Sequence, residues 1–172
     1  IEPAEISVFS FGMAHKVRSD HYRRLRALLE ATGRPYVVQL STALHENTRF
    51  DGPFTSALGE MHEIFGERMC FLGFLSDRLV YHHLLRATFF AAFFDRGVRA
   101  NNTSVHTAME HGAAVITNLD EHSPAEFAHL DNVIDILQCR MLPLEASELR
   151  TRARATAQRF GWDRLLSAMN PV

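Results

Sequence analysis

Cysteine and long apolar runs are both scarce in this sequence. It has two cysteines among 172 residues, and both Cys70 and Cys139 lie in apolar runs. We therefore expect two buried free thiols and a reducing compartment, the cytoplasm. No apolar stretch approaches the roughly 20 residues that a transmembrane helix needs, and no signal peptide is visible. The longest apolar run, residues 88–94, is short enough to be a buried strand.

An excess of charge of one sign is also missing. The 18 Lys and Arg residues nearly balance the 20 Asp and Glu residues, giving a net charge of -2. Without a basic surface, nucleic acid is not expected as the main partner. The length predicts one domain over residues 1–172, and the composition is typical of a globular protein. Because the chain begins with Ile1 rather than Met, we expect it to be a piece of a longer protein.

Metal-binding and hydrolase motifs are lacking as well. His82 and His83 are adjacent, and four residues separate His106 from His111, so neither pair has the spacing of a zinc motif such as HExxH. His45-Glu46 lacks the second histidine of that motif. No serine lies in a G-x-S-x-G elbow, which argues against hydrolases of that type. We expect no metal site.

Apolar segments with strand and helix character alternate along the whole chain. Such alternation predicts an α/β, Rossmann-like open parallel sheet with helices on both faces. Ligands bind such sheets at the carboxyl ends of the strands, which draws attention to the loops after Gly12, Phe94 and Thr117. The expected strands are residues 6–13, 36–40, 69–74, 87–94, 113–117 and 133–137, and residues 41–51 are expected to be a loop. The expected helices start at Ser19 or Asp20, span 54–65, start again at Ser76, and span 103–111 and 146–159.

The carboxyl-terminal segment has no strand partner in the sequence. Its long helix is followed by Trp162 and by a short amphipathic helix that carries Leu165 and Met169. This tail packs either on the sheet of its own domain or on another domain, and the pattern alone leaves both possibilities open.

A cluster of small polar residues directly follows the most apolar strand. Asn101, Asn102, Thr103 and Ser104 open a helix there, and the free N–H groups and dipole of a helix N-terminus favour anions. Arg99 or its neighbour Arg96 would supply countercharge. The same small polar residues are also favoured as plain N-caps, which is the alternative.

Two further loops contain candidate binding residues. Lys16 follows Gly12 at the end of the first strand, where a lysine can contact a phosphate, although the glycines of a P-loop or dinucleotide fingerprint are absent. The turn at Gly73 precedes Phe74 and Leu75 and would let the chain approach a flat base. A solvated lysine and a simple turn are the alternatives.

In this order the features resemble the C-terminal domain of GT-B-fold glycosyltransferases, in particular the retaining group similar to glycogen synthase and sucrose synthase. The resemblance covers nearly the whole chain. It implies that Gly12 and Lys16 bind the donor diphosphate and that residues 71–76, FLGFLS, line the base pocket. Residues 108–112, AMEHG, match the end of the following helix, and residues 159–164 resemble the helix that crosses back to the N-terminal domain.

The sequence also departs from this pattern. The two positions of the retaining group's Glu-x7-Glu motif hold Arg99 and Thr107, and Met13 replaces an arginine that usually follows the first glycine. Residues 99–104 are closer to a basic-small-Ser loop that a subset of these proteins carries. Glu110 lies one helical turn beyond Thr107.

The resemblance implies a donor-binding domain that takes a nucleotide diphosphate-sugar, a UDP-sugar, for metal-independent glycosyl transfer with no other cofactor. Lys16, Arg99, Asn102, Thr103 and Ser104 are the expected diphosphate ligands. An N-terminal domain would supply the acceptor site, so this domain alone is expected to be inactive. An epimerase of the same fold and a non-catalytic nucleotide-binding domain are the rival functions, whereas a receiver domain would need acidic residues after its first strand.

Overall fold

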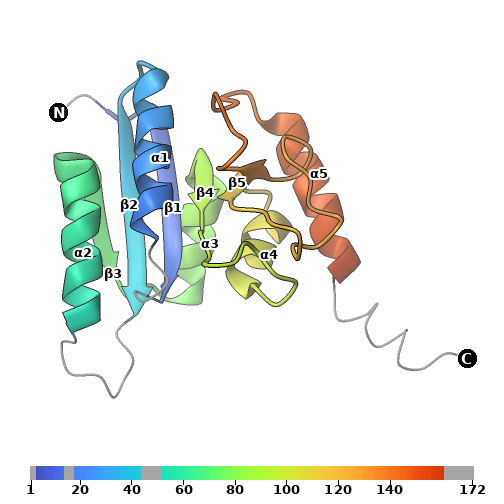
Figure 1. The fold of residues 1–172 in the computed structure, drawn as a ribbon, viewed down its shortest axis with the longest axis horizontal. Helices are drawn as coiled ribbons and strands as arrows, with labels where there is room; N and C mark the ends of the chain where they lie inside the picture. Colours follow the sequence, from blue (N-terminus) through green and yellow to red (C-terminus); the bar gives the residue numbers. More distant parts are fainter. Residues whose placement is uncertain (1–2, 14–17, 44–51, 161–172) are drawn as a thin grey trace, which may run out of the picture.

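The computed structural model describes residues 3–13, 18–43 and 52–160. Six parallel strands form one sheet in the order β3-β2-β1-β4-β5-β6 (Figure 1). The predicted open parallel sheet is therefore confirmed. The strands are β1 (Ile6–Met13), β2 (Tyr36–Ala43), β3 (Met69–Gly73), β4 (Phe89–Ala91), β5 (Val115–Thr117) and β6 (Ile134–Asp135).

Helices cover both faces of the sheet (Figure 1). On one face, α1 (Ser19–Ala31) and α2 (Gly52–Phe65) pack on Val8, Val38 and Phe89. On the other face, α3 (Asp77–Arg86), α4 (Thr103–Glu110) and α5 (Ser147–Ala157) contribute buried residues to the core cluster that contains Phe9 and Phe90. Burial on both faces explains why the central strands read as continuous apolar runs. Within the described ranges, no helix is both long and apolar enough to cross a membrane.

The direction in which the sheet grows reverses between β1 and β4. Successive strands β2 and β3 lie on one side of β1, whereas β4, β5 and β6 follow one another on its other side. Helical connections on opposite faces diverge at such a point and leave a crevice outside the carboxyl ends of the two strands. The topology thus directs attention to the residues that follow β1 and β4.

Several element boundaries differ from the expected ones. Strand β2 continues through Ser41 and Thr42, because β1 extends to Met13 and pairs with it as far as Ala43. Strands β4, β5 and β6 are shorter than their apolar runs, because flanking residues such as Ala92, Ala114 and Ile136 are buried without belonging to the strands. A 3-10 turn, η3 (Gln158–Phe160), closes α5. The tail with Trp162, Leu165 and Met169 lies outside the described residues.

The two thiols have different environments. Cys139 is buried, and burial raises the pKa of its thiol. Cys70 is exposed, so the expectation that both thiols are buried is wrong for Cys70. The reason is its place on β3, the edge strand, none of whose residues is fully buried, so side chains there are less covered than those of the central strands.

Candidate functional site

A cavity of about 670 Å³ opens at the reversal point of the sheet. Its size is typical of small-molecule binding sites. Most of its wall comes from the ends of β1 and β2, the residues after β3 and β4, and the first turns of α4, and α1 and α3 contribute further residues. The residues from these five segments are Ser10, Phe11, Gly12, Leu40, Ser41, Thr42, Phe74, Leu75, Ala92, Phe93, Phe94, Thr103, Ser104 and Thr107.

Hydroxyl groups lie along the part of the wall that β1 and β2 form. Ser10 Oγ and Tyr22 Oη are 2.7 Å apart and share a hydrogen bond, and Ser41 Oγ donates to the Gly73 carbonyl at 2.9 Å. Burial raises the pKa of Tyr22 to about 12, so its hydroxyl keeps its proton at neutral pH. Thr42 is only 5% exposed, and its Oγ1 has no hydrogen-bond partner among the residues that the structure describes. A buried polar group without a partner is uncommon in native proteins and calls for an explanation.

The N-terminus of α4 opens on the same cavity without a side-chain cap. Asn102 is the N-cap residue, but its Oδ1 accepts the Arg99 N–H at 2.6 Å instead of capping the helix. Thr103 N–H donates to the Asn101 carbonyl, whereas Ser104 N–H finds no partner within the described ranges. Since Thr103 and Ser104 line the cavity, an available helix-end donor lies at its wall. Plain capping by these polar side chains, the alternative drawn from the sequence, is not observed.

An aromatic surface lies on the α3 side of the cavity. Phe74 is 77% exposed and follows Gly73, which has a positive φ of 69° that suits glycine. Tyr81 from α3 also lines the cavity and packs edge-on against the His111 ring, with the ring centroids 4.6 Å apart. The cavity therefore joins an apolar, aromatic wall to a polar helix N-terminus, an arrangement that suits a ligand with one flat and one anionic part.

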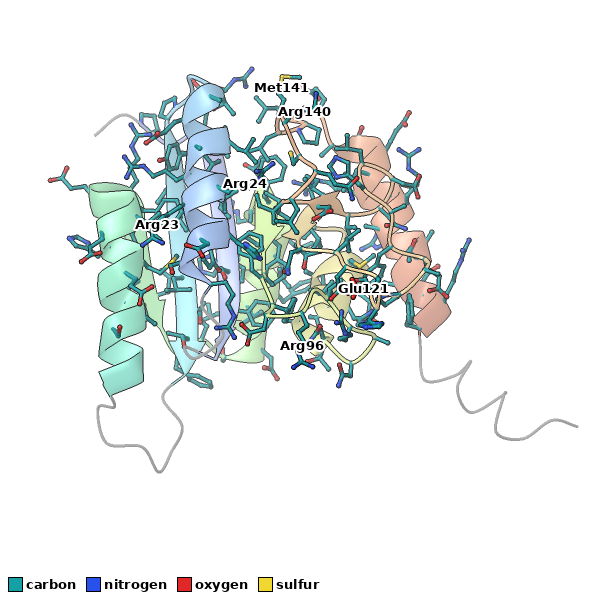
Figure 2. The ribbon with its side chains drawn as sticks, viewed as in Figure 1. Arg23, Arg24, Arg96, Glu121, Arg140 and Met141 are labelled. Atoms are coloured by element: carbon teal, nitrogen blue, oxygen red, sulfur yellow. The ribbon has the colours of Figure 1, made fainter. Side chains whose placement is uncertain are left out.

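Cations are scarce at this cavity. No lysine or arginine of the described ranges is among its lining residues. Arg18, just before α1, pairs with Asp95 after β4. Arg96, in the loop after β4, and Glu121, in the loop after β5, both lie in the lower half of the molecule as drawn in Figure 2. Positive charge for an anion must come from such flanking loops or from a residue that the structure does not describe.

The structure brings together six of the ten residues predicted for the site. These six line the one cavity: Gly12, Phe74, Leu75, Thr103, Ser104 and Thr107.

Three other predicted residues do not line this cavity. Arg99 is paired with Asp120, Asn102 turns its side-chain oxygen to the Arg99 amide, and Glu110 is exposed at the far end of α4. Lys16 lies outside the described residues. The ligand-binding role of all ten remains a prediction.

The sequence does not predict three residues that line the cavity, Ser41, Thr42 and Tyr22. The polar segment 41–51 predicts a loop, whereas Ser41 and Thr42 belong to β2; a polar pair directly after the apolar run 36–40 is itself a signal for a strand's carboxyl end. Tyr22 was read only as an apolar helix position. In the described ranges, no group of three His, Cys, Asp or Glu side chains could hold a metal ion. The absence of a metal site from the whole chain stays a prediction.

No protein-family model and no curated protein sequence matches this chain. Its fold nevertheless matches solved glycosyltransferases. Sucrose-phosphate synthase from Thermosynechococcus elongatus aligns with a TM-score of 0.65 at 14% identity, over 97% of this chain and 44% of that one. A UDP-forming trehalose-phosphate synthase from Burkholderia xenovorans aligns with a TM-score of 0.64 at 11% identity, over 98% and 45%.

A third structure is itself a single domain. The C-terminal domain of a glycosyl transferase group 1 family protein from Francisella tularensis aligns with a TM-score of 0.60 at 11% identity, over 91% of this chain and 86% of that one. This chain thus spans less than half of the two longer enzymes and nearly all of an isolated C-terminal domain. The chain therefore has the fold that its sequence resemblance implied, that of the C-terminal domain of GT-B glycosyltransferases.

Proposed function

We propose that this chain is the donor-binding domain of a glycosyltransferase and that its cavity binds a UDP-sugar. The observation that carries the proposal is the uncapped N-terminus of α4, with the unpartnered Ser104 N–H, at a cavity on the reversal point of the sheet. One protein of similar fold is named for forming UDP, which supports UDP as the product released here.

The diphosphate would lie against the first turn of α4. The Thr103 and Ser104 hydroxyls and the Ser104 N–H supply donors, and the helix dipole adds about half a positive charge at that end. Charge builds on the diphosphate as the sugar leaves, so donors that are already in place lower the barrier most. Gly12 leaves room at the end of β1, and Lys16 would bring the positive charge that the described wall lacks.

The nucleoside would lie toward α3. Phe74 and Leu75 offer an apolar surface to the flat base, and Thr107, one turn into α4, faces the same cavity. The Thr42 hydroxyl, buried and unpaired, is suited to a hydrogen bond with a polar group of the ligand.

The acceptor would bind to a second domain. The chain covers 44% and 45% of the two long enzymes that share its fold, so a region of similar length in those enzymes has no counterpart here. In this proposal the domain holds the donor, and transfer needs both halves. In this proposal no metal ion is required, because the N-terminus of α4 and Lys16 would stabilise the leaving diphosphate.

Titration calorimetry with UDP and with uridine tests the proposal. Ser104→Ala removes a donor to a charged phosphate, an interaction worth roughly 1.5–3 kcal/mol, so UDP should bind about tenfold more weakly or worse. The affinity for uridine should fall less than the affinity for UDP, because uridine has no phosphate. Arg152→Ala is the control, since Arg152 pairs on the surface with Asp131 and Glu148, away from the cavity. Absence of UDP binding to the wild-type domain, or equal losses for UDP and uridine, would contradict the proposal.

A further inference from the structure

The loop that leads into α4 rests on the loop that follows β5. Gly97 has a positive φ of 72°, and a Cβ added there would lie 2.8 Å from Asp120 Cγ. Val98 N–H donates to the Asn118 carbonyl at 2.9 Å. The two loops are therefore in direct contact just before the helix whose N-terminus opens on the cavity.

Arg99 joins these loops through two parallel hydrogen bonds. Its Nη1 and Nη2 donate to Asp120 Oδ1 and Oδ2, each at 2.7 Å, and Nη1 also donates to the Val98 carbonyl. The two side chains are 29% and 23% exposed, so the pair is sheltered from solvent more than most surface ion pairs. Bidentate pairing restricts the orientation of both groups as well as their distance.

Both partners are fixed on their own loops. Asp120 Oδ1 also accepts the His122 N–H at 2.9 Å, and the Asp120 N–H donates to Ser123 Oγ at 3.0 Å. On the other side, Arg99 N–H donates to Asn102 Oδ1, and Asn102 is the N-cap of α4. A continuous chain of hydrogen bonds thus runs from the β5 loop through Asp120 and Arg99 to the start of the helix.

This geometry leaves little of Arg99 for a ligand. Its two terminal nitrogens are engaged by Asp120, and it is not among the residues that line the cavity. To contact a phosphate it would have to leave Asp120, whose partly buried carboxylate would then lose its cation. The sequence pattern suggested a direct phosphate ligand, whereas the contacts favour an indirect role.

We propose that Arg99 and Asp120 are positioning residues, which hold the N-terminus of α4 in place at the cavity without contacting the ligand. The inference rests on the proposed function in so far as that ligand is a nucleoside diphosphate. It goes beyond that proposal in assigning Asp120 a role and in giving Arg99 a different role from Ser104.

Removal of the carboxylate separates a positioning role from direct binding. If Arg99 bound the diphosphate itself, Asp120→Ala would free it, and UDP would bind as well as before or more tightly. If the pair positions α4, Asp120→Ala and Arg99→Ala should each weaken UDP binding by about tenfold, the size of a typical coupling between contacting residues. Arg99→Lys keeps the charge but not the two parallel bonds, so it should fall between wild type and Arg99→Ala.

The exchanged pair sharpens this test. In the double variant Arg99→Asp with Asp120→Arg, a positioning role predicts tighter UDP binding than in either single alanine variant, because an ion pair is restored. A direct contact between Arg99 and the phosphate predicts the weakest UDP binding of all these variants, because an aspartate would replace the arginine that binds the phosphate. The exposed pair of Arg152 and Asp131 is the matched control, and Arg152→Ala and Asp131→Ala should leave UDP binding unchanged.

Amide hydrogen exchange without any nucleotide tests the positioning role independently of the ligand. Val105 and His106 N–H donate to the Asn102 carbonyl in the first turn of α4, and Asn102 N–H donates to the Arg99 carbonyl. These amides should exchange about tenfold faster in Asp120→Ala and Arg99→Ala than in wild type, and not faster in Arg152→Ala. If UDP fails to bind wild type while exchange rises, the proposed function is wrong and the positioning role stands. Unchanged exchange, or unweakened UDP binding in Asp120→Ala, would overturn the positioning role.

Discussion

The side chain of Asn118 exchanges two hydrogen bonds with the backbone of Phe94. Phe94 N–H donates to Asn118 Oδ1 at 2.8 Å, and Asn118 Nδ2 donates to the Phe94 carbonyl at 2.7 Å. This side-chain amide continues the bonding between β4 and β5 past the last backbone bond, in which Ala92 N–H donates to Ile116 O. Asn118 is 4% exposed, so the loop leaving β4 is held by a buried amide at the edge of the cavity.

Asn118→Ala should therefore destabilise the domain strongly. It leaves the partly buried N–H and C=O of Phe94 without partners, and each such loss costs about 1–3 kcal/mol, so we expect the free energy of unfolding to fall by about 2–6 kcal/mol in total. Urea unfolding followed by circular dichroism measures the change. Asn101→Ala, at an exposed position, should stay within about 0.5 kcal/mol of wild type. A loss below about 1 kcal/mol for Asn118→Ala would show that water replaces its hydrogen bonds.

Two glycines with the same backbone conformation allow the contact between the loops to be measured. Gly33 has a φ of 67° and open space around an added Cβ, whereas at Gly97 that Cβ would meet Asp120 Cγ at 2.8 Å. Both Gly→Ala variants pay about 1 kcal/mol for the left-handed conformation. The free energy of unfolding should fall by about 1–3 kcal/mol more in Gly97→Ala than in Gly33→Ala, because the added Cβ overlaps Asp120. Equal losses in urea unfolding would mean that the Asp120 loop moves aside freely.

The stability contributed by Asp120 should depend on pH in the acid range. The hydrogen bonds from Arg99, more than any other cause, lower the pKa of this carboxyl from 3.8 to about 2. A lowered folded-state pKa means that the ionised carboxylate stabilises the fold above about pH 4 and that this stabilisation is lost as pH falls toward 2. The difference in unfolding free energy between wild type and Asp120→Asn should accordingly shrink from pH 4 to pH 2. A difference that stays constant over this range would contradict the lowered pKa.

The isolated domain should fold but transfer no sugar. The described residues form a six-stranded sheet that helices cover on both faces, which supports cooperative folding of this domain alone. In the proposed function the acceptor binds to another domain, so incubation with UDP-glucose and a panel of sugar acceptors should give no glycoside by mass spectrometry. Turnover above the rate of donor hydrolysis would show that this domain contains a whole active site.

Features that depend on neighbours in sequence could be predicted from the chain. The order and type of its helices and strands follow from long apolar runs bounded by Gly33, Gly66 and Gly112. The sequence predicts that Gly12, Leu75 and Ser104 lie near one another, because each follows the end of a strand or begins a helix, and all three line the cavity. Parallel topology brings such ends to one edge of the sheet, so local signals sufficed to gather them.

Features that depend on distant pairing could not be predicted in this way. The extension of β2 to Ala43 needs its ladder with Met13, and the exposure of Cys70 needs the strand order that puts β3 at the edge. The sequence around Arg99 predicts a free cation, because its partner, Asp120, is 21 residues away in an ordinary polar loop. No local pattern indicates which of several nearby carboxylates such an arginine will bind.

The most direct test of the account is a backbone amide NMR titration of the wild-type domain with UDP and, separately, with uridine. Both ligands should shift the amides of Phe74 and Leu75, because both carry the base. Only UDP should shift the amides of Thr103, Ser104 and Val105 strongly, since only its diphosphate reaches the N-terminus of α4. Equal shifts at Ser104 for the two ligands, or UDP-induced shifts that leave the first turn of α4 untouched, would contradict the placement of a nucleoside diphosphate in this cavity.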